Sequence, residues 1–394
     1  MFQPDPLSAA ARQIARDQAA TAEFPALLAR KWQRMALSPL GYLRGAAPLF
    51  YELLQQHPEL AEGPDGEGWL IGDAHLENFG AFRTSDGPGA GSVVFDANDF
   101  DEAVIGPFRW DVVRLLTSLI LGGRELGSNG KQSVALCSAI FDGYIPALCE
   151  GAHEKADPPP VRRLLDKVGA RTHKDLLASR TERSGAGLRF LRGDRYTDLA
   201  GDLAAKARTA FEHYVERIDP QRELARDHLV IEDVAFRIAG TGSLGGLRIA
   251  VLTTGKGQLD NRWIFDMKVE GTPAAQVLLG APSEAPAARV LHAAQACLEH
   301  APRMAGTTEL DDRSLFVRRL LPQEDKLDLT KLRAEELPAL ARYLGARLGL
   351  VHRRGATLPP RAAWTDAERS RLTEHAIVIA GLHEAAYLAL CKTL

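Results

Sequence analysis

The sequence has 394 residues, of which 45% are hydrophobic and 25% charged, and its formal net charge is −3. This length exceeds the usual size of one hydrophobic core and predicts two lobes or domains. Because the charge is nearly balanced, no basic field points to nucleic acid or to a membrane surface, and we expect neither as a partner.

The four cysteines lie far apart and form no CxxC pair, which disfavours structural zinc and a disulfide framework. The N-terminal stretch MFQPDPLSAAARQIARDQ lacks the apolar core of a signal peptide. The most apolar runs, such as DVVRLLTSLILGG, are too short and too charged to span a bilayer. We therefore expect a cytoplasmic protein, and the sequence leaves its oligomeric state open.

In chain order, residues 24–57 carry apolar residues at helical spacing. Residues 69–100 predict a β-hairpin, because NFGAF and SVVFDAND are strand-like and RTSDGPGAG between them is rich in turn formers. Residues 110–150 return to a helical pattern. The segment from DPPPVRR to about residue 228 also predicts charged helix.

The pattern changes near residue 230. Three strand-like runs, LVIEDVAFRIAG, GLRIAVLTT and NRWIFDMKVE, predict an antiparallel meander. A helix over 284–300 and a strand in RSLFVRRLL follow, and the chain is helical from about 331 to 394. We expect an α+β protein in three parts, with residues 1–229 mainly helical, 230–322 rich in β-structure and 323–394 helical.

The predicted hairpin places polar residues where they can meet. Residues equidistant from the turn of an antiparallel pair face each other, and Asn78 and Asp99 are equidistant from Pro88–Gly89. Asp73 lies a few residues before the first strand. We therefore expect Asp73, Asn78 and Asp99 to converge. Asp and Asn oxygens are ligands that Mg²⁺ takes together with phosphate oxygens, and a further Asp can accept a hydroxyl proton.

Plainer interpretations of these residues remain open. A single Asp or Asn at a strand end is usually a turn or cap residue. Asp96 is an alternative metal ligand, although its odd separation from Asp99 puts the two on opposite faces of a regular strand. Asp101 and Glu102 also fit solvated residues. His75 fits a structural histidine that bonds the loop backbone better than it fits a metal ligand.

GTGSLG, residues 240–245, matches the pattern GxGxxG. Because it lies between two predicted strands, it fits a kinase-type hairpin over phosphates better than a dinucleotide-binding turn, which needs a following helix. An ordinary glycine-rich turn is the alternative. The residues expected to contact a nucleotide here are Gly240, Thr241, Gly242, Ser243 and Gly245.

Lys268 lies in the next predicted strand, where a kinase places its phosphate-pairing cation. The strand period puts Asp266 and Lys268 on one face and Phe265 and Met267 on the other. Taken alone, a lysine at a strand end is usually exposed. The predicted helix 284–300 offers two acidic partners for the lysine, Glu284 and Glu299.

These segments resemble a known superfamily. GDAHLEN resembles the catalytic loop of aminoglycoside phosphotransferases and choline kinases, and NDFDEAVIGPFRWDVVRL resembles their metal loop. The resemblance implies that Asp73 is the catalytic base, that Asn78 and Asp99 bind Mg²⁺ and that Asp111 braces the catalytic loop. It also implies ATP as the nucleotide and a small-molecule hydroxyl acceptor in preference to a protein.

The whole chain also resembles a bacterial family of unknown function, domain of unknown function 2252, which shares RGAA, GDAHLENFG, NDFDEA, GTGSLG and a strand with a lysine. Some positions depart from the phosphotransferase pattern. Ile71 replaces a common histidine, the metal loop has DFD instead of DFG, and the Asp of the following G-D-P element is missing. None of these changes removes a residue that the chemistry needs.

The order of the motifs is unusual, because the glycine loop and the lysine follow the catalytic loop instead of preceding it. We therefore expect a circularly permuted, two-lobed, protein-kinase-like fold, with the nucleotide lobe inserted near 230–322 and the last helices completing the catalytic lobe. Rival functions are a nucleotidyl (AMP) transferase, a nucleotide-binding pseudokinase without turnover and a metallophosphoesterase.

Overall fold

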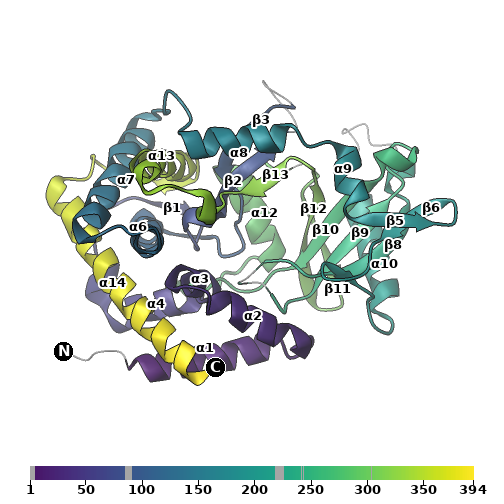
Figure 1. The fold of residues 1–394 in the computed structure, drawn as a ribbon, viewed down its shortest axis with the longest axis horizontal. Helices are drawn as coiled ribbons and strands as arrows, with labels where there is room; N and C mark the ends of the chain where they lie inside the picture. The colour runs from purple at the N-terminus through teal and green to yellow at the C-terminus, as the bar shows by residue number, and fades with distance from the viewer. Residues whose placement is uncertain (1–4, 85–90, 218–225, 241, 243, 303) are drawn as a thin grey trace.

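Helices gather at one end of the molecule and a six-stranded antiparallel sheet at the other, so the chain has the α+β class that the sequence predicts (Figure 1). The computed structural model describes residues 5–84, 91–217, 226–240, 242, 244–302 and 304–394. The chain starts in the helical end, passes through the sheet and returns to the helical end.

The first helices begin at strong start signals. The Asp5 carboxylate accepts the N–H groups of Leu7 (3.1 Å) and Ser8 (3.2 Å), and the Ser38 hydroxyl accepts the N–H group of Gly41 (3.1 Å). The elements are α1 (Pro6–Ala20), η1 (Pro25–Leu27), α2 (Leu28–Met35), α3 (Pro39–Gly45), α4 (Ala47–Gln56) and α5 (Pro58–Ala61).

The predicted hairpin forms, but its register differs by one residue from the predicted one. Phe79 pairs with Ala97, which places Asn78 opposite Asn98 and not opposite Asp99. The N–H group of Asn98 donates to the carbonyl of Asn78 at 3.0 Å. Register follows the length and geometry of the connecting loop, which the residue pattern alone did not specify.

The turn at Pro88–Gly89, on which that prediction is centred, lies outside the described residues. The strands and helices of this region are β1 (Glu67–Leu70), η2 (Leu76–Asn78), β2 (Phe79–Arg83), β3 (Val93–Ala97), β4 (Val104–Pro107), α6 (Phe108–Glu125) and α7 (Gly130–Glu150).

The sequence predicts only helix in the segment before residue 228. The structure also contains short strands there. Thr181–Ser184 pairs with Gly187–Phe190 across a tight turn at Gly185, whose φ is 60°. These strands are polar and short, so they lack the alternation that identifies a strand in a sequence. The elements are α8 (Pro159–Gly169), α9 (His173–Ala178), β5 (Thr181–Ser184), β6 (Gly187–Phe190), β7 (Tyr196–Thr197), α10 (Leu203–Arg217) and η3 (Arg226–Leu229).

The large sheet contains the predicted meander, in the order β11-β12-β10-β9-β8-β7. Phe265 and Met267 of β10 face a core that α10 covers, where the rings of Phe265 and Phe211 lie 5.0 Å apart. Asp266 and Lys268 occupy the other face, as the strand period predicts. The elements are β8 (Ile231–Arg237), β9 (Arg248–Thr253), η4 (Leu259–Asn261), β10 (Trp263–Val269), α11 (Gln276–Leu279), α12 (Pro286–Cys297), β11 (Gly306–Leu310) and β12 (Arg313–Leu320).

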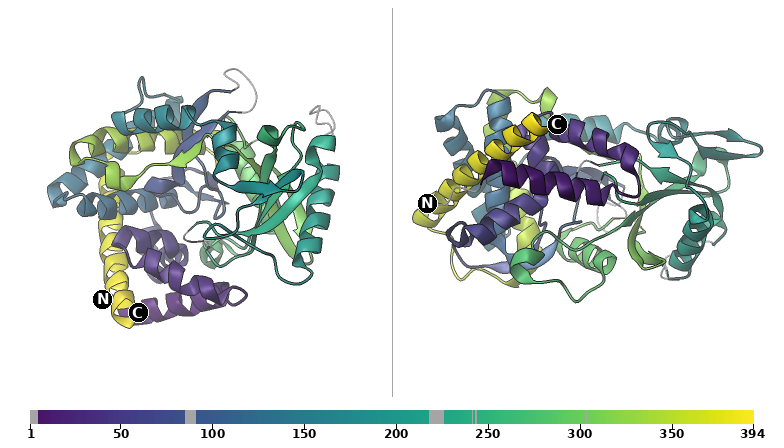
Figure 2. Two further views of the ribbon diagram at one scale, coloured as in Figure 1. Left: turned by 45° about the vertical axis from the view of Figure 1, so that its right-hand side comes forward. Right: turned by 90° about the horizontal axis from the view of Figure 1, so that it is seen from below.

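The last part of the chain returns to the helical end. Strand β13 adds to the β2–β3 hairpin, β14 pairs with β1, and α14 lies beside α1 and α6 (Figure 2). Neither β13 nor β14 is evident in the sequence, because each has three residues. The elements are β13 (Glu324–Lys326), η5 (Leu329–Lys331), η6 (Ala334–Glu336), α13 (Leu337–Arg354), β14 (Ala356–Leu358) and α14 (Asp366–Thr393).

Among the residues that the structure describes, two helices, α7 and α14, have the length and mean hydropathy of membrane spans, at 1.2 and 1.3. In this structure α7 packs against α13 and α6, and α14 packs against α6, α1 and α3. About half of the apolar window of α7 is buried by these contacts, and 39% of that of α14. Length and hydropathy alone do not distinguish a membrane span from a helix of a folded core.

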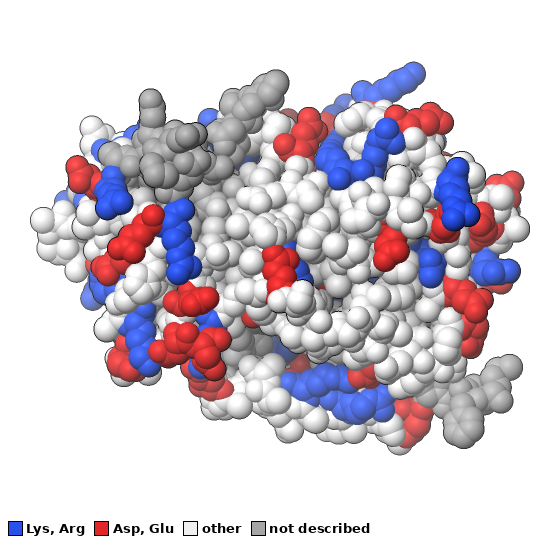
Figure 3. Space-filling view, turned by 180° about the vertical axis from the view of Figure 1, so that it is seen from behind, with Lys and Arg blue, Asp and Glu red and all other residues white. Residues whose placement is uncertain are grey.

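Basic and acidic side chains are interspersed over the face shown in Figure 3, in keeping with the nearly balanced charge. Exposed pairs such as Arg124–Glu384 (2.7 Å) and Arg342–Glu154 (2.8 Å) join distant segments at the surface. Exposed pairs of this kind each contribute about 0–1 kcal/mol. The buried contacts therefore matter more for holding the helical end against the large sheet.

Helices α7 and α13 approach closely because glycines line their contact. A Cβ atom at Gly345 would collide with the carbonyl oxygen of Ile140, and one at Gly143 would collide with that of Arg342. Such backbone approach leaves no room for a side chain. This contact fixes α13, which carries His352, a residue that lies behind the candidate site described below.

We expect Gly345→Ala to lower the free energy of unfolding by about 1–3 kcal/mol, because the added methyl group separates α7 from α13. Gly381→Ala in α14 is the matched control, since a Cβ atom there meets no atom within 4 Å. This control should raise stability by about 0.5–1 kcal/mol through helix propensity. Urea unfolding of both variants provides the measurement, and equal shifts would contradict the packing argument.

Candidate active site

A cleft of about 420 Å³ lies between the helical part and the large sheet. It brings together residues from both sides of the molecule that the sequence singles out. The predicted site residues that line it are Asp73, His75, Asn78, Asp99, Gly240, Gly242 and Lys268. Gly245 does not line the cleft but packs on Thr21, and Thr241 and Ser243 lie outside the described residues.

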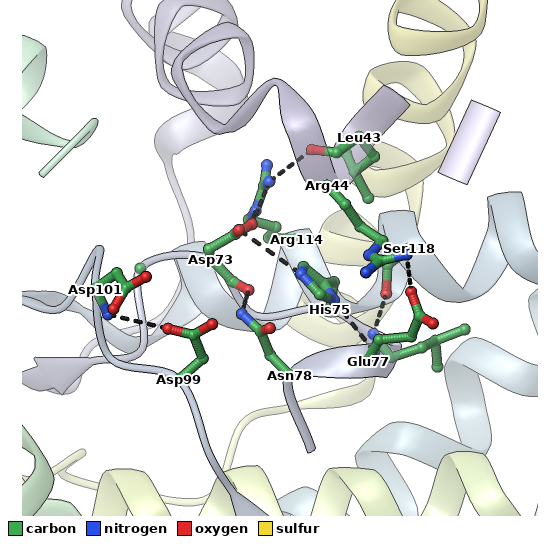
Figure 4. Close-up of polar contacts among 12 residues, drawn as sticks. Leu43, Arg44, Asp73, His75, Glu77, Asn78, Asp99, Asp101, Arg114 and Ser118 are labelled. Carbon is green, nitrogen blue, oxygen red and sulfur yellow. Dashed lines mark hydrogen bonds and ion pairs between the residues drawn. The ribbon is translucent and has the colours of Figure 1, made fainter. Parts of the chain in front are cut away.

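Asp73 is held by a buried arginine (Figure 4). Nε of Arg114 donates to Oδ1 of Asp73 at 2.6 Å, and Nη2 of Arg114 donates to the carbonyl of Leu43 at 3.0 Å. Arg114 is fully buried, so the carboxylate is its main compensating charge. Burial raises the pKa of Asp73 to about 6, although Arg114 acts in the opposite direction.

The short helix η2 positions His75 and Asn78 beside Asp73. Nδ2 of Asn78 donates to the carbonyl of Asp73 at 2.8 Å, which leaves Oδ1 as its atom able to bind a cation. Nδ1 of His75 accepts the N–H group of Glu77 at 3.1 Å, a contact with the loop backbone of the kind that the sequence suggests. Burial holds the pKa of His75 well below its usual range, which favours the neutral ring.

Asp99 faces the cleft and Asp96 does not. The N–H group of Asp101 donates to Oδ1 of Asp99 at 3.4 Å, and Nζ of Lys326 lies 4.0 Å from Oδ2. Asp96 is buried, and its carboxylate accepts the N–H group of Ala97 at 2.9 Å. Of these two aspartates, only Asp99 lines the cleft.

Asp111 lies behind the loop that carries Asp73 and binds the backbone of that loop. Its carboxylate accepts the N–H groups of Ile71 at 2.6 Å and Gly72 at 3.0 Å, and it lies 3.2 Å from Nε2 of His352 in α13. Gly72 has φ 79°, and a side chain there would collide with the carbonyl of Glu102. The strand-to-loop turn before Asp73 therefore depends on a glycine and on a buried carboxylate.

Lys268 pairs with acids other than the two that the sequence suggests. Its Nζ contacts Oδ2 of Asp101 and lies 3.5 Å from Oε1 of Glu270. The predicted partners are wrong, because Glu284 contacts His292 and Glu299 lies 3.6 Å from Arg354. The ion-pair partners of a strand residue depend on which loop folds over the strand, and the sequence does not show which loop does so.

Helix α12 contributes an arginine to this region instead of an acid. Nη2 of Arg289 donates to the carbonyls of Asp101 and Gly271, both at 2.9 Å, and Nη1 contacts the carbonyl of Ala103. Arg289 is 2% exposed. The loop that carries Asp99 and Asp101 is thus tied to the sheet side of the cleft.

The glycine loop is held from the other side by the first helices. Nζ of Lys31 in α2 donates to the carbonyl of Gly242 at 3.0 Å, and Nη1 of Arg34 contacts the carbonyl of Gly240. Lys31 is itself paired with Asp17 of α1 at 3.0 Å. Gly240 and Gly242, in the connection between β8 and β9, therefore contact the N-terminal helices.

A second cavity of about 320 Å³ adjoins the first beneath the large sheet. Its wall includes Asp266, which pairs with Arg237 at 2.6 Å and with Arg248 at 2.8 Å. Burial opposes ionisation, but the two arginines hold the pKa of Asp266 well below its usual range. The two cavities share the lining residues Asp99, Asp101, Gly240, Arg248, Lys268 and Lys326.

Five residues in or directly behind the cleft are not predicted from the sequence, namely Arg44, Asp101 as a lysine partner, Arg114, Glu270 and Lys326. Arg114 left a usable signal. It is a lone charge within the apolar run VVRLLTSLIL, and a charge in such a run is either exposed or paired inside the protein. Arg44 lies in RGAA and Asp101 in NDFDEA, so the family motifs include both residues without showing what they contact. Nothing local marks Glu270 or Lys326.

The described residues contain no group of three or more His, Cys, Asp or Glu side chains that could hold a metal ion. A multi-ligand metal centre would need such a group. Mg²⁺ has a different requirement, since it keeps several waters and takes one or two carboxylates together with phosphate oxygens. Asn78 and Asp99 fit that requirement.

A family model described as an uncharacterised protein conserved in bacteria, domain of unknown function 2252, matches residues 23–393. The chain belongs to this family. The matched range of the family includes every predicted site residue of the cleft, and helix α1 precedes it. No curated protein and no solved structure matches the chain.

We expect Asp73 to titrate near pH 6 in the metal-free protein, because burial raises its pKa from the ordinary 3.8. The folded state then binds this proton more tightly than the unfolded state does. The contribution of Asp73 to the free energy of unfolding is therefore present below about pH 4 and is lost as the pH rises through 6.

Carboxyl ¹³C NMR measures this titration, with Asp73→Asn to assign the signal. The difference in unfolding free energy between the two proteins should change over the same pH window. A carboxyl signal of Asp73 that titrates below pH 4.5 would contradict the expectation.

Proposed function

We propose that the protein is a magnesium-dependent phosphotransferase that moves the γ-phosphoryl group of ATP to a hydroxyl group of a small molecule. The observation that carries the proposal is the meeting of four separate segments at one cleft. These are the Asp73 loop, the Asp99 loop, the glycine loop and strand β10 with Lys268. Phosphoryl transfer needs this combination of a base, metal ligands and a phosphate-binding cation.

Lys268, Arg248 and Lys326 provide positive charge where the two cavities join. In the proposal, Lys268 and the backbone of the glycine loop bind the phosphates, and the second cavity receives the base. The pairing of Lys268 with Asp101 means that a phosphate group must share or replace this carboxylate. Asn78 and Asp99 would hold Mg²⁺, which supplies charge neutralisation for the phosphates.

Asp73 orients the acceptor hydroxyl and takes its proton. The acceptor oxygen forms a bond to the γ-phosphorus, the bond from that phosphorus to the bridging oxygen breaks, and ADP leaves with the electron pair. Arg114 fixes the carboxylate at 2.6 Å, and a pKa of about 6 keeps Asp73 ionised yet basic near neutral pH. Positioning and charge neutralisation supply most of the rate in such a site.

The proposal includes a permuted protein-kinase-like fold, with the large sheet as the nucleotide lobe. The contacts of the last segment support it. Strand β13 pairs with β2 beside Asn78, and β14 pairs with β1, which leads into the Asp73 loop. His352 of α13 also contacts Asp111. The C-terminal segment therefore completes the surroundings of a loop that lies near the start of the chain.

ATP with Mg²⁺ should raise the melting temperature of the wild-type protein, because ligand binding to the folded state alone stabilises it. At a concentration 100 times the Kd, the expected gain is about 2.7 kcal/mol. Lys268→Ala and Asp99→Ala should lose most of this gain. Lys206→Ala is the matched control, since Lys206 lies on α10 and pairs there with Asp202 and Asp311. Absence of a shift in the wild type counts strongly against a nucleotide site.

Asp73→Asn should keep the stabilisation by MgATP and lower the transfer rate by about 10²–10⁴-fold, the usual contribution of a positioned base. The assay measures acceptor-dependent ADP release over a panel of metabolites and aminoglycosides. Release of pyrophosphate instead of ADP would identify AMP transfer, and binding of MgATP without any turnover would support a nucleotide-binding module. Unchanged transfer by the variant would remove Asp73 from the mechanism.

A further inference from the structure

One wall of the cleft comes from the first helices, to which the proposed chemistry assigns no role. Helices α1–α3 contribute Gln13, Arg16, Lys31 and Arg44, together with Asp17. Arg44 contacts Glu77 of the loop that follows Asp73, and its positive charge lowers the pKa of Asp73 against the effect of burial. This wall, the N-terminal wall, therefore lies beside the candidate base.

The N-terminal wall and the rest of the cleft differ in their lining charges. The wall carries three cations and one acid, and the rest of the cleft carries five acids, Asp73, Asp99, Asp101, Glu102 and Glu270, with three cations, Arg248, Lys268 and Lys326. Each cation of the wall is paired, Lys31 with Asp17, Arg16 with Glu52 and Arg44 with Glu77, so the wall is close to neutral as a whole. What it offers an anion is therefore the unused donors of its guanidinium groups and not a net positive charge.

Two arginines of the N-terminal wall each have a nitrogen donor that makes no hydrogen bond among the described residues. Arg16 contacts Glu52 through Nη2, and Arg44 contacts Glu77 through Nη1. Nη1 of Arg16 and Nε of Arg44 are buried, and neither has a hydrogen-bond partner in the described protein. A buried donor without a partner costs about 1–3 kcal/mol, so a ligand that satisfies it binds with that advantage.

Gln13 adds an acceptor to the same wall and is only 2% exposed. Its Nε2 donates to Oδ1 of Asp17 at 2.9 Å and to the carbonyl of Gly45 at 3.3 Å, so both amide hydrogens have acceptors and the orientation of the amide is fixed. Its Oε1 is buried without a partner among the described residues. That oxygen is able to accept a hydrogen bond from a ligand hydroxyl.

We infer that the N-terminal wall binds the acceptor and that this acceptor is a small hydroxylated anion with a carboxylate or phosphate group. Arg16 and Arg44 donate to the acidic group, because guanidinium nitrogens match the geometry of carboxylate and phosphate oxygens. Gln13 accepts from a hydroxyl. Lys31 takes no part, since Asp17 and the carbonyl of Gly242 already hold it. The inference rests on the proposed phosphotransferase function, to which it adds the class of the acceptor.

Two matched series of probes test the charge of the acceptor by isothermal titration calorimetry and saturation-transfer NMR. The six-carbon series is gluconate, glucitol and glucamine, and the three-carbon series is glycerate, glycerol and 3-aminopropane-1,2-diol. Within each series the frame is constant and the charge changes from negative to neutral to positive. Glycerol 3-phosphate added to the second series separates a preference for phosphate from one for carboxylate.

We expect the wild type to bind the anion of at least one series about tenfold more tightly than the neutral or cationic member. Arg16→Gln should remove this preference. Arg12→Gln is the matched control, because Arg12 also pairs with Glu52 (3.3 Å) but does not line the cleft. The order in which the wild type binds the anionic, neutral and cationic probes tests the proposed charge of the acceptor even if Arg16→Gln does not fold.

Stabilisation by MgATP, measured in the same samples, separates the two proposals. If MgATP binds but the probes bind equally well, do not bind or favour the cation, the proposed class of acceptor is overturned. The phosphotransferase proposal is then left intact. Anion preference without MgATP binding overturns the phosphotransferase proposal and supports an anion site alone. Equal loss of anion binding in Arg12→Gln and Arg16→Gln overturns the assignment of the N-terminal wall.

Discussion

The buried carboxylate of Asp111 is the contact on which the cleft depends. It accepts two backbone N–H groups of the loop before Asp73 and lies 3.2 Å from His352, whose other ring nitrogen lies 2.9 Å from the Tyr144 hydroxyl. Helices α6, α7 and α13 are thereby fixed around one loop. Breaking such a buried pair costs more than its formation gains, because the remaining group stays buried without a partner.

Helix α6 combines two supporting functions within one turn. Asp111 binds the backbone of the loop, and Arg114, three residues later, binds the side chain of Asp73. Residues three apart lie on the same side of a helix, so a single helix face sets both the path of the loop and the direction of its carboxylate. This arrangement pre-organises Asp73, and the orientation of its carboxylate therefore depends on the position of α6.

The sequence identifies the parts of the site that are local in the chain. The loops of Asp73 and Asp99, the glycine hairpin and the face of β10 that carries Lys268 all follow from short patterns of residues. The one-residue error in the β2–β3 register arose because register depends on the connecting loop. The partners of Lys268 and of Asp73 were missed, because Asp101 and Arg114 meet them only in the folded chain.

The contacts of the N-terminal wall also affect when the first helices can fold into place during synthesis. Lys31 bonds to Gly242, and α1 packs against α14 at the other end of the chain, so the wall has few partners until much later segments leave the ribosome. Contacts between residues so far apart form slowly and leave apolar surface exposed meanwhile. During synthesis, the N-terminal wall therefore takes its final place only after these later segments have been made, and a partly made chain has no complete cleft.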